Sequence, residues 1–272
     1  MASRNPTGRS SDGLAKPVEE QLHRAAVDGY QRQSEAYVRS RPSYHPAIVE
    51  RVVELHQPEP DSSLTLIEIG AGTGIFTEQM AETGLTVRAV EPVEAMRSTL
   101  ERRLPGVAAI DGAAERLPFE SDSAATVVAA QAFHWFDYEA ALDEIARVLA
   151  VGGHLITVWN VRDNLVPWVA GVTALIDRYS DGTPRHHTMR WRLAIDGDER
   201  FTLVEDFGMD HPWPATPDGV VDRTMSTSFI GALDPAEQAV VVAEIRAIVE
   251  PLGPTFDYPY ISELQAWRLG PA

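Results

Sequence analysis

The sequence contains no cysteine among its 272 residues. Disulfides, thiol nucleophiles and metal sites with cysteine ligands are therefore excluded. No stretch approaches the roughly 20 consecutive apolar residues that a membrane-spanning helix needs, and the polar first residues lack the apolar segment of a secretory signal. We therefore expect a cytoplasmic protein with no membrane partner, in which residues 1–20 form a disordered leader.

Positive charge is also scarce, because 23 Lys and Arg face 40 Asp and Glu, for a formal net charge of −17. Such a surface repels phosphate backbones, so we expect no nucleic-acid partner. One short stretch departs from this balance, since it holds five basic side chains within eight residues: Arg185, His186, His187, Arg190 and Arg192. Two interpretations stay open. The stretch attracts an anionic small molecule, with Arg190 and Arg192 binding the substrate, or it is a solvated loop that balances nearby acids.

Short apolar strands alternate with amphipathic helices along most of the chain. The pattern predicts strands at 64–70, 85–92, 106–112, 124–133, 154–160, 201–213 and 256–269. It predicts helices at 46–56, 75–84, 94–104, 137–153, 166–183 and 234–250, and an irregular basic segment at 184–199. This alternation is typical of a doubly wound α/β fold, in which helices cover both faces of a mostly parallel, here seven-stranded, sheet.

The first strand runs into a glycine-rich turn, in the stretch LIEIGAGTGIFTEQM at residues 64–78. Glycine lets the chain turn sharply and pass close to a ligand. The spacing differs from the dinucleotide fingerprint, since Ile75 stands where that motif has its third glycine. Glu68 beside the turn favours a ligand with an ammonium group over a pyrophosphate, and Glu91 ends the second strand at the spacing of a ribose ligand. The pattern therefore predicts a ligand with a ribose and an amino group but no essential phosphate.

Four successive motifs resemble those of class I S-adenosylmethionine-dependent methyltransferases: EIGAGTG, VEPVEAM, DGAAERLPFESDSAATVVAAQAFHWF and EIARVLAVGGHL. Upstream, AYVRSRPSYHP together with FHWFD resembles the small-molecule subgroup that includes trans-aconitate methyltransferase. The resemblance implies a Rossmann-like methyltransferase fold and S-adenosyl-L-methionine as cofactor. It also implies cofactor-binding roles for Tyr37, Arg41, Tyr44, Glu68, Gly70, Ala71, Gly72, Glu91, Pro92, Met96, Ala113, Ala114, Glu115, Gln131 and Ala132.

The motif FHWFD at residues 133–137 supplies the candidate catalytic residue, His134, and candidate acceptor-binding residues, Phe133 and Trp135. His134 is either a general base or a packed core histidine. A hydroxyl acceptor would need a base, whereas a carboxylate is already ionised at neutral pH and needs none. No metal site is expected, because the pair His186–His187 has no acid at ligand spacing.

Taken together, these motifs predict an enzyme that transfers a methyl group to a small-molecule acceptor, with a carboxylate or hydroxyl oxygen as the site of methylation. The expected organisation is a leader at 1–20, an N-terminal helical lid at 21–60, the cofactor-binding core at 61–161, a substrate-cap insertion at 162–200, and strands and helices completing the core at 201–272. A monomer or a homodimer is expected. Two alternatives stay open: a non-catalytic module that only binds the cofactor, and a nicotinamide-dependent oxidoreductase.

Overall fold

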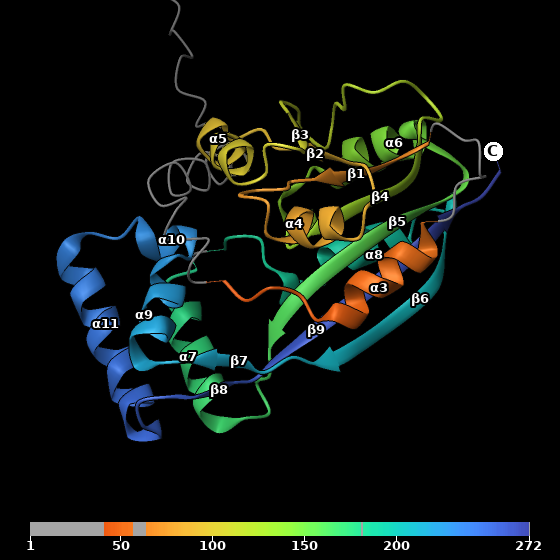
Figure 1. Ribbon diagram of the computed structural model, residues 1–272. Coiled ribbons are helices and arrows are strands. Elements are labelled where there is room, and N and C mark those ends of the chain that lie inside the picture. Colours follow the sequence, from red (N-terminus) through yellow and green to blue (C-terminus); the bar gives the residue numbers. More distant parts are fainter. Residues whose placement is uncertain (1–40, 57–63, 181, 272) are drawn as a thin grey trace, which may run out of the picture.

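The computed structural model describes residues 41–56, 64–180 and 182–271, and places a seven-stranded sheet at the centre of the molecule (Figure 1). The strand order is β3-β2-β1-β4-β5-β9-β6. The strands are β1 (Thr65–Ile69), β2 (Val87–Val90), β3 (Ala108–Ile110), β4 (Ala124–Ala130), β5 (Leu149–Arg162), β6 (Phe201–Asp210) and β9 (Tyr260–Leu269). Strands β1 to β5 are parallel to one another, and β9 runs antiparallel to β5 and β6. The predicted fold class is confirmed.

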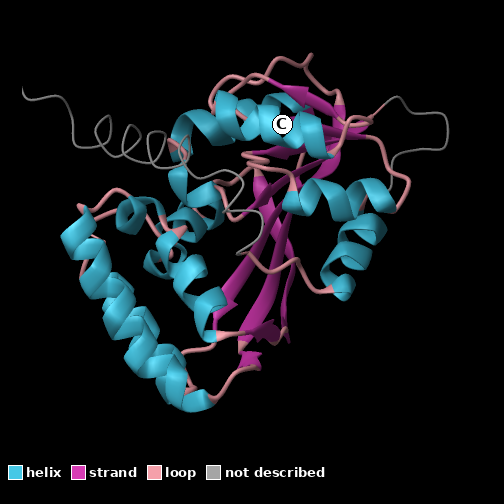
Figure 2. Cartoon of the chain, turned by 60° about the vertical axis from the view of Figure 1, so that its left-hand side comes forward, coloured by secondary structure: helices cyan, strands magenta, loops and turns pink. Residues whose placement is uncertain are grey.

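Helices cover both faces of this sheet (Figure 2). One face packs against α3 (Pro46–Leu55), α4 (Ile75–Glu82) and α5 (Glu94–Arg103), and the other against α6 (Tyr138–Val148) and α8 (Arg190–Asp196). Side chains fix where two of these helices begin. The Asp137 carboxylate accepts from the amide of Ala140 at the start of α6, and the His45 imidazole accepts from Ala47 at the start of α3.

A second group of helices, which we call the cap, lies at the ends of β5 and β9 that are remote from the C-terminus (Figure 1). Its members share one hydrophobic cluster: α7 (Pro167–Asp177), α9 (Pro217–Met225), α10 (Ser228–Gly231), α11 (Pro235–Val249) and the paired strands β7 (Trp213–Ala215) and β8 (Phe256–Tyr258). The substrate-cap insertion predicted at residues 162–200 contributes α7 to this cluster, and the other members come from residues after 200. Segments on both sides of β6 share apolar contacts that no local pattern reveals.

Several predicted boundaries also move. The strand predicted at 256–269 divides into β8 and β9 at Pro259, which has no amide hydrogen for strand pairing. The helix predicted at 137–153 ends at Val148, and Gly152 lies inside β5. The segment predicted as irregular contains α8, whose Trp191 and Ile195 are spaced one turn apart and buried. Within the described ranges no helix is long and apolar enough to cross a membrane.

Candidate active site

The sheet order reverses between β1 and β4, and the glycine turn lies at this point. Gly70, Gly72 and Gly74 all have positive φ, at 68°, 59° and 84°. A Cβ on Gly70 would lie 2.6 Å from the Cβ of Ala132 at the end of β4, so this position excludes a side chain. Gly72 faces open space, with only the Met96 sulfur 3.8 Å from an added Cβ. The turn is therefore packed on one side and open to a ligand on the other.

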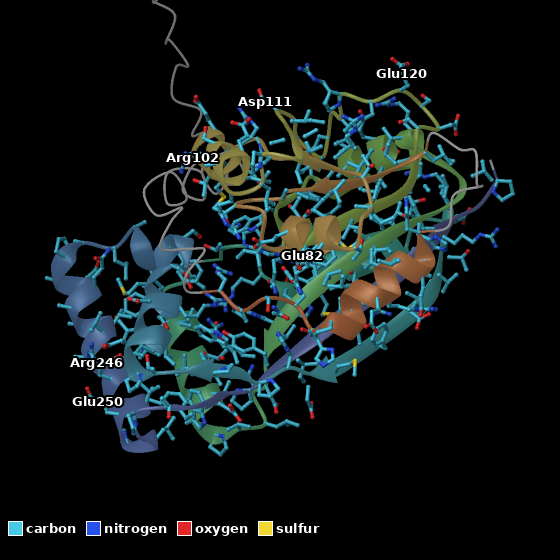
Figure 3. The ribbon with its side chains drawn as sticks, in the orientation of Figure 1. Glu82, Arg102, Asp111, Glu120, Arg246 and Glu250 are labelled. Atoms are coloured by element: carbon cyan, nitrogen blue, oxygen red, sulfur yellow. The ribbon has the colours of Figure 1, made fainter. Side chains whose placement is uncertain are left out.

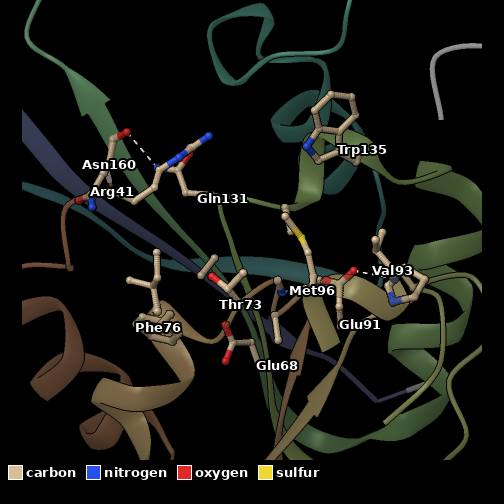
Figure 4. Close-up of a pocket in the computed structure, with 18 of the residues that line it drawn as sticks. Arg41, Glu68, Thr73, Phe76, Glu91, Val93, Met96, Gln131, Trp135 and Asn160 are labelled. Atoms are coloured by element: carbon tan, nitrogen blue, oxygen red, sulfur yellow. Dashed lines mark hydrogen bonds between the residues drawn. The ribbon is translucent and has the colours of Figure 1, made fainter. Parts of the chain in front are cut away.

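Glu91 ties the end of β2 to this turn. Its Oε2 accepts a hydrogen bond from the Gly72 amide at 2.8 Å, and its Oε1 accepts one from the Val93 amide at 2.8 Å (Figure 4). The side chain is 5% exposed, and burial raises its pKa although the two amide hydrogen bonds lower it. Each carboxylate oxygen keeps a second lone pair, so Glu91 can accept further hydrogen bonds from ribose hydroxyls.

Glu68 lies below the same turn and is 1% exposed. It accepts a hydrogen bond from the Thr77 hydroxyl at 2.6 Å. Burial raises the pKa of Glu68 to about 8, the Thr77 hydrogen bond lowers it, and the nearby charge of Glu91 raises it further. A cation that binds beside this buried carboxyl favours its ionised form, because the positive charge offsets the cost of burying the carboxylate. The site therefore fits the ammonium group of the predicted ligand.

These residues line one cavity, which we call the cofactor cavity. The described residues to which the resemblance gave cofactor roles all lie on its wall: Arg41, Tyr44, Glu68, Gly70, Ala71, Gly72, Glu91, Pro92, Met96, Ala113, Ala114, Glu115, Gln131 and Ala132. Tyr37 lies outside the described residues. The wall also holds side chains to which the resemblance gave no cofactor role: Thr73, Ile75, Phe76, Val93, Phe136, Asn160, Arg223 and Tyr260. The cavity also contains the buried carboxylates of Glu68 and Glu91, which can accept hydrogen bonds from an ammonium group and from ribose hydroxyls. The cavity therefore fits the implied cofactor.

A second cavity, which we call the basic cavity, adjoins the first. It is lined by four arginines and three histidines: Arg41, Arg162, Arg185, Arg223, His134, His186 and His187. Among the described residues on its wall there is no Asp or Glu. This contrasts with the acidic chain as a whole, whose carboxylates Glu82, Asp111 and Glu120 lie on the outer surface (Figure 3). Six residues line both cavities and form what we call the shared wall: Arg41, Gln131, Trp135, Asn160, Arg223 and Tyr260.

Two of these arginines, the half-buried Arg162 and the buried Arg223, form no salt bridge with a carboxylate in the described part of the chain, although the charge of Asp177 acts on Arg162 and raises its pKa. Arg162, at the end of β5, donates from Nε to the Tyr258 hydroxyl at 2.9 Å. Arg223, on α9, is 8% exposed, and its Nε has no hydrogen-bond partner among the residues that the structure describes. Burial, followed by the positive charges of Arg41 and Arg162, lowers the pKa of Arg223 to about 10. A buried positive charge without a counterion, as at Arg223, favours an anionic ligand.

His134 lies on the wall of the basic cavity, between Trp135 and Trp159, with ring centroids 4.9 and 5.5 Å away. Burial, and then the charges of His186, Arg185 and Arg41, lower its pKa to about 3. An imidazole with this pKa stays neutral at physiological pH and holds an abstracted proton poorly. The general-base interpretation of His134 therefore loses support, whereas a contact with the acceptor remains open to it.

The structure separates the other predicted acceptor residues. Trp135 lies on the shared wall, whereas Phe133 lines neither cavity: it is fully buried in the core, and its ring stacks on Tyr138 with the centroids 6.2 Å apart. Arg190 is exposed and lines neither of these cavities, and Arg192 pairs with Asp196 and Asp206 away from both. The structure does not place Arg190 or Arg192 on these cavities, and their substrate contacts stay predictions. Within the same basic stretch, Arg185 and the two histidines reach the basic cavity instead.

Sequence reasoning missed Arg162, Arg223 and Tyr260. Arg162 had a usable signal, because it ends the fifth strand at the sheet edge where the glycine turn lies. Arg223 and Tyr260 follow no motif and reach the site through the cap and the antiparallel strand β9. Within the described ranges no group of three His, Cys, Asp or Glu is placed to hold a metal ion.

Comparison with known proteins identifies the class. Residues 67–157 match the model of a family described as a methyltransferase domain. The chain is 37% identical over 194 residues to an uncharacterized methyltransferase of Mycobacterium bovis, which covers 71% of this chain and 74% of that protein. It is 35% identical over 215 residues to an uncharacterized methyltransferase-like protein of Schizosaccharomyces pombe, covering 79% of this chain and 83% of that one.

Solved structures share the fold. A type II methyltransferase from Anaeromyxobacter dehalogenans superposes with a TM-score of 0.58 at 22% identity, over 85% of this chain and 99% of that one. The chain therefore belongs to the class I S-adenosylmethionine-dependent methyltransferases. It is an enzyme whose cofactor is S-adenosylmethionine, and the two alternatives left open by the sequence fall away.

Proposed function

We propose that this methyltransferase O-methylates a carboxylate group of a small anionic acceptor. The observation that carries the proposal is the basic cavity beside the cofactor cavity, with four arginines, three histidines and no carboxylate among its described lining residues. In a chain of net charge −17, such a cavity selects anions against the surrounding surface.

The chemistry needs little from the protein beyond binding and positioning. When bound, S-adenosylmethionine supplies a methyl group whose carbon–sulfur bond breaks, with the electron pair passing to sulfur, as an acceptor oxygen bonds to the carbon. We propose that Glu68 and Glu91 hold the ammonium and ribose groups of the cofactor, as the resemblance implies. A carboxylate has no proton to lose at neutral pH, so the low pKa of His134 does not hinder the reaction.

The remaining residues then hold the acceptor dry and close to the cofactor. Arg223 supplies a buried positive charge on the shared wall, and the half-buried Arg185, which also forms a salt bridge with Asp177, supplies a second positive charge to the basic cavity. Trp135 lines both cavities, and we propose that its apolar ring helps to exclude water from the reacting oxygen. The trans-aconitate subgroup, the cytoplasmic location and the monomeric or dimeric state stay predictions.

The test uses methyl-labelled cofactor with a panel of small carboxylic acids and phenols. We expect a base-labile methyl ester from at least one acid. Arg185→Gln should raise the KM for this acid about tenfold or more, since a charge-assisted contact is lost. Arg190→Gln is the matched control from the same basic stretch and should leave the KM unchanged. Turnover of phenols alone, or equal effects of the two variants, would contradict the proposal.

A further inference from the structure

In the proposed reaction an acceptor oxygen meets the methyl group at the shared wall. The hydrogen-bond partners of the polar side chains there therefore decide which of them can bind the acceptor. Two of them are already used within the protein. The Asn160 amide donates to the Ser43 carbonyl at 3.0 Å, while its side-chain oxygen accepts from the Ser262 hydroxyl. The Gln131 amide donates to the Asn160 carbonyl at 2.9 Å. Their hydrogen-bonding groups hold the wall together.

Tyr260 differs from both. It is the first residue of β9 and is 2% exposed, and its hydroxyl has no hydrogen-bond partner among the described residues. Its neighbour Tyr258, with a ring centroid 4.8 Å away, accepts a hydrogen bond from Arg162. A buried hydroxyl without a partner is uncommon in folded proteins and calls for an explanation. Because Tyr260 lines both cavities, a ligand at their boundary can supply the missing partner.

The positive charges that face Tyr260 come from several elements: Arg223 on α9, Arg162 at the end of β5 and Arg41 before α3. The phenol of Tyr258 on β8 is a further titratable neighbour. Burial raises the pKa of Tyr260, but the positive charges of Arg223, Arg162 and Arg41, together with a close side-chain contact to Arg223, outweigh it and lower the pKa below its ordinary value. A phenol in this setting donates a strong hydrogen bond while it keeps its proton, and it becomes an anion at alkaline pH.

We propose that Tyr260 binds the acceptor directly: its hydroxyl donates a hydrogen bond to one oxygen of the acceptor carboxylate at the shared wall. The second oxygen is thereby held toward the cofactor cavity, with the charge of Arg223 beside it. The inference rests on the proposed function, because it requires a carboxylate acceptor. It adds a residue that orients the nucleophile and that no sequence motif marks.

The test compares Tyr260→Phe with Tyr138→Phe, which removes a hydroxyl from a tyrosine that lines neither of these cavities. Tyr260→Phe should fold normally, because its hydroxyl makes no hydrogen bond within the described protein. We expect it to bind S-adenosylhomocysteine with wild-type affinity and to raise the KM for the methylated acid about tenfold. Tyr138→Phe should leave the KM unchanged.

The pH profile gives a second readout that a structural role would not move. In the wild-type enzyme the Tyr260 phenolate repels the carboxylate, so kcat/KM falls at alkaline pH, and Tyr260→Phe should lack this fall. Wild-type KM and an unchanged alkaline fall in Tyr260→Phe would overturn the role of Tyr260 and leave the proposed function standing. A different outcome is that the wild-type enzyme methylates only phenols, at a rate that rises with pH and is lost in Tyr260→Phe. Tyr260 would then be a general base, and both the carboxylate acceptor and the carboxylate-binding role of Tyr260 would be rejected. If the enzyme methylates no carboxylate at all, both proposals fail as well.

Discussion

The carboxylate of Glu91 and the amide of Gly72 lie 2.8 Å apart in a hydrogen bond that joins the ends of β2 and β1. Through this contact the acid that follows the second strand holds the glycine turn that follows the first strand in place. A cofactor that bonds to Glu91 therefore also contacts a turn whose position Glu91 sets.

Glu91→Ala should weaken the binding of S-adenosylhomocysteine by about 1.5–3 kcal/mol, because charge-assisted hydrogen bonds to ribose are lost in a partly dry site. Titration calorimetry measures this. Glu94→Ala, an exposed acid at the start of α5, is the control and should bind like the wild type. Wild-type affinity in Glu91→Ala would reject Glu91 as the ribose ligand.

A comparison of Gly70→Ala with Gly84→Ala distinguishes the destabilisation caused by backbone strain from that caused by side-chain crowding. Both glycines have positive φ, but a Cβ at Gly84 meets nothing within 4 Å, whereas one at Gly70 lies 2.6 Å from Ala132. Gly84→Ala should lower the free energy of unfolding by about 1 kcal/mol. Gly70→Ala should lower it by roughly 2–5 kcal/mol, since overpacking adds to the strain, and should also impair cofactor binding. If urea denaturation gives the two variants equal losses in the free energy of unfolding, Ala132 moves away from the added methyl group without an energetic penalty.

Glu68 should make the folded protein less stable as pH rises. Its pKa is raised from 4.5 to about 8 in the folded chain, so between these values the folded state holds a proton that the unfolded state has lost. This contribution to stability is therefore lost progressively from about pH 4.5 to about pH 8, at up to about 1.4 kcal/mol per pH unit.

Glu68→Gln cannot ionise, so its stability relative to the wild type should increase between pH 5 and pH 8 in denaturant titrations. Glu82→Gln, an exposed acid on α4, is the control and should show a constant difference from the wild type. A flat difference for Glu68→Gln as well would mean that Glu68 ionises normally in the folded state.

Arg223→Met should stabilise the ligand-free protein while it impairs turnover of the acceptor. The variant replaces a buried charge that has no carboxylate partner among the described residues, and such replacements often gain about 1–4 kcal/mol. A gain of this size raises Tm by roughly 2–4 °C per kcal/mol. Arg246→Met, at an exposed ion pair with Asp218, should leave the Tm close to that of the wild type. A lower Tm for Arg223→Met would show that the protein already compensates this charge.

The sequence by itself determined the sheet, the glycine turn and the cofactor cavity. Each of these depends on short-range patterns: alternating apolar runs, glycines at a turn that needs positive φ, and an acid at a fixed distance along the chain. Residues such as Glu68, Gly70 and Glu91 belong to neighbouring parallel strands, whose ends meet at one sheet edge whenever the fold forms. Their meeting place therefore follows from the order of the strands alone.

Only the tertiary structure decided the acceptor side. Arg223 and Tyr260 come from a cap helix and an antiparallel strand, and they reach Arg162 through packing between segments far apart in the sequence. The basic stretch shows the same limit, because the helical turn that starts at Arg190 directs the buried face of Trp191 inward and leaves Arg190 in solvent. Local spacing cannot reveal which side of a short helix faces a cavity, since that depends on the apolar surface against which the helix packs.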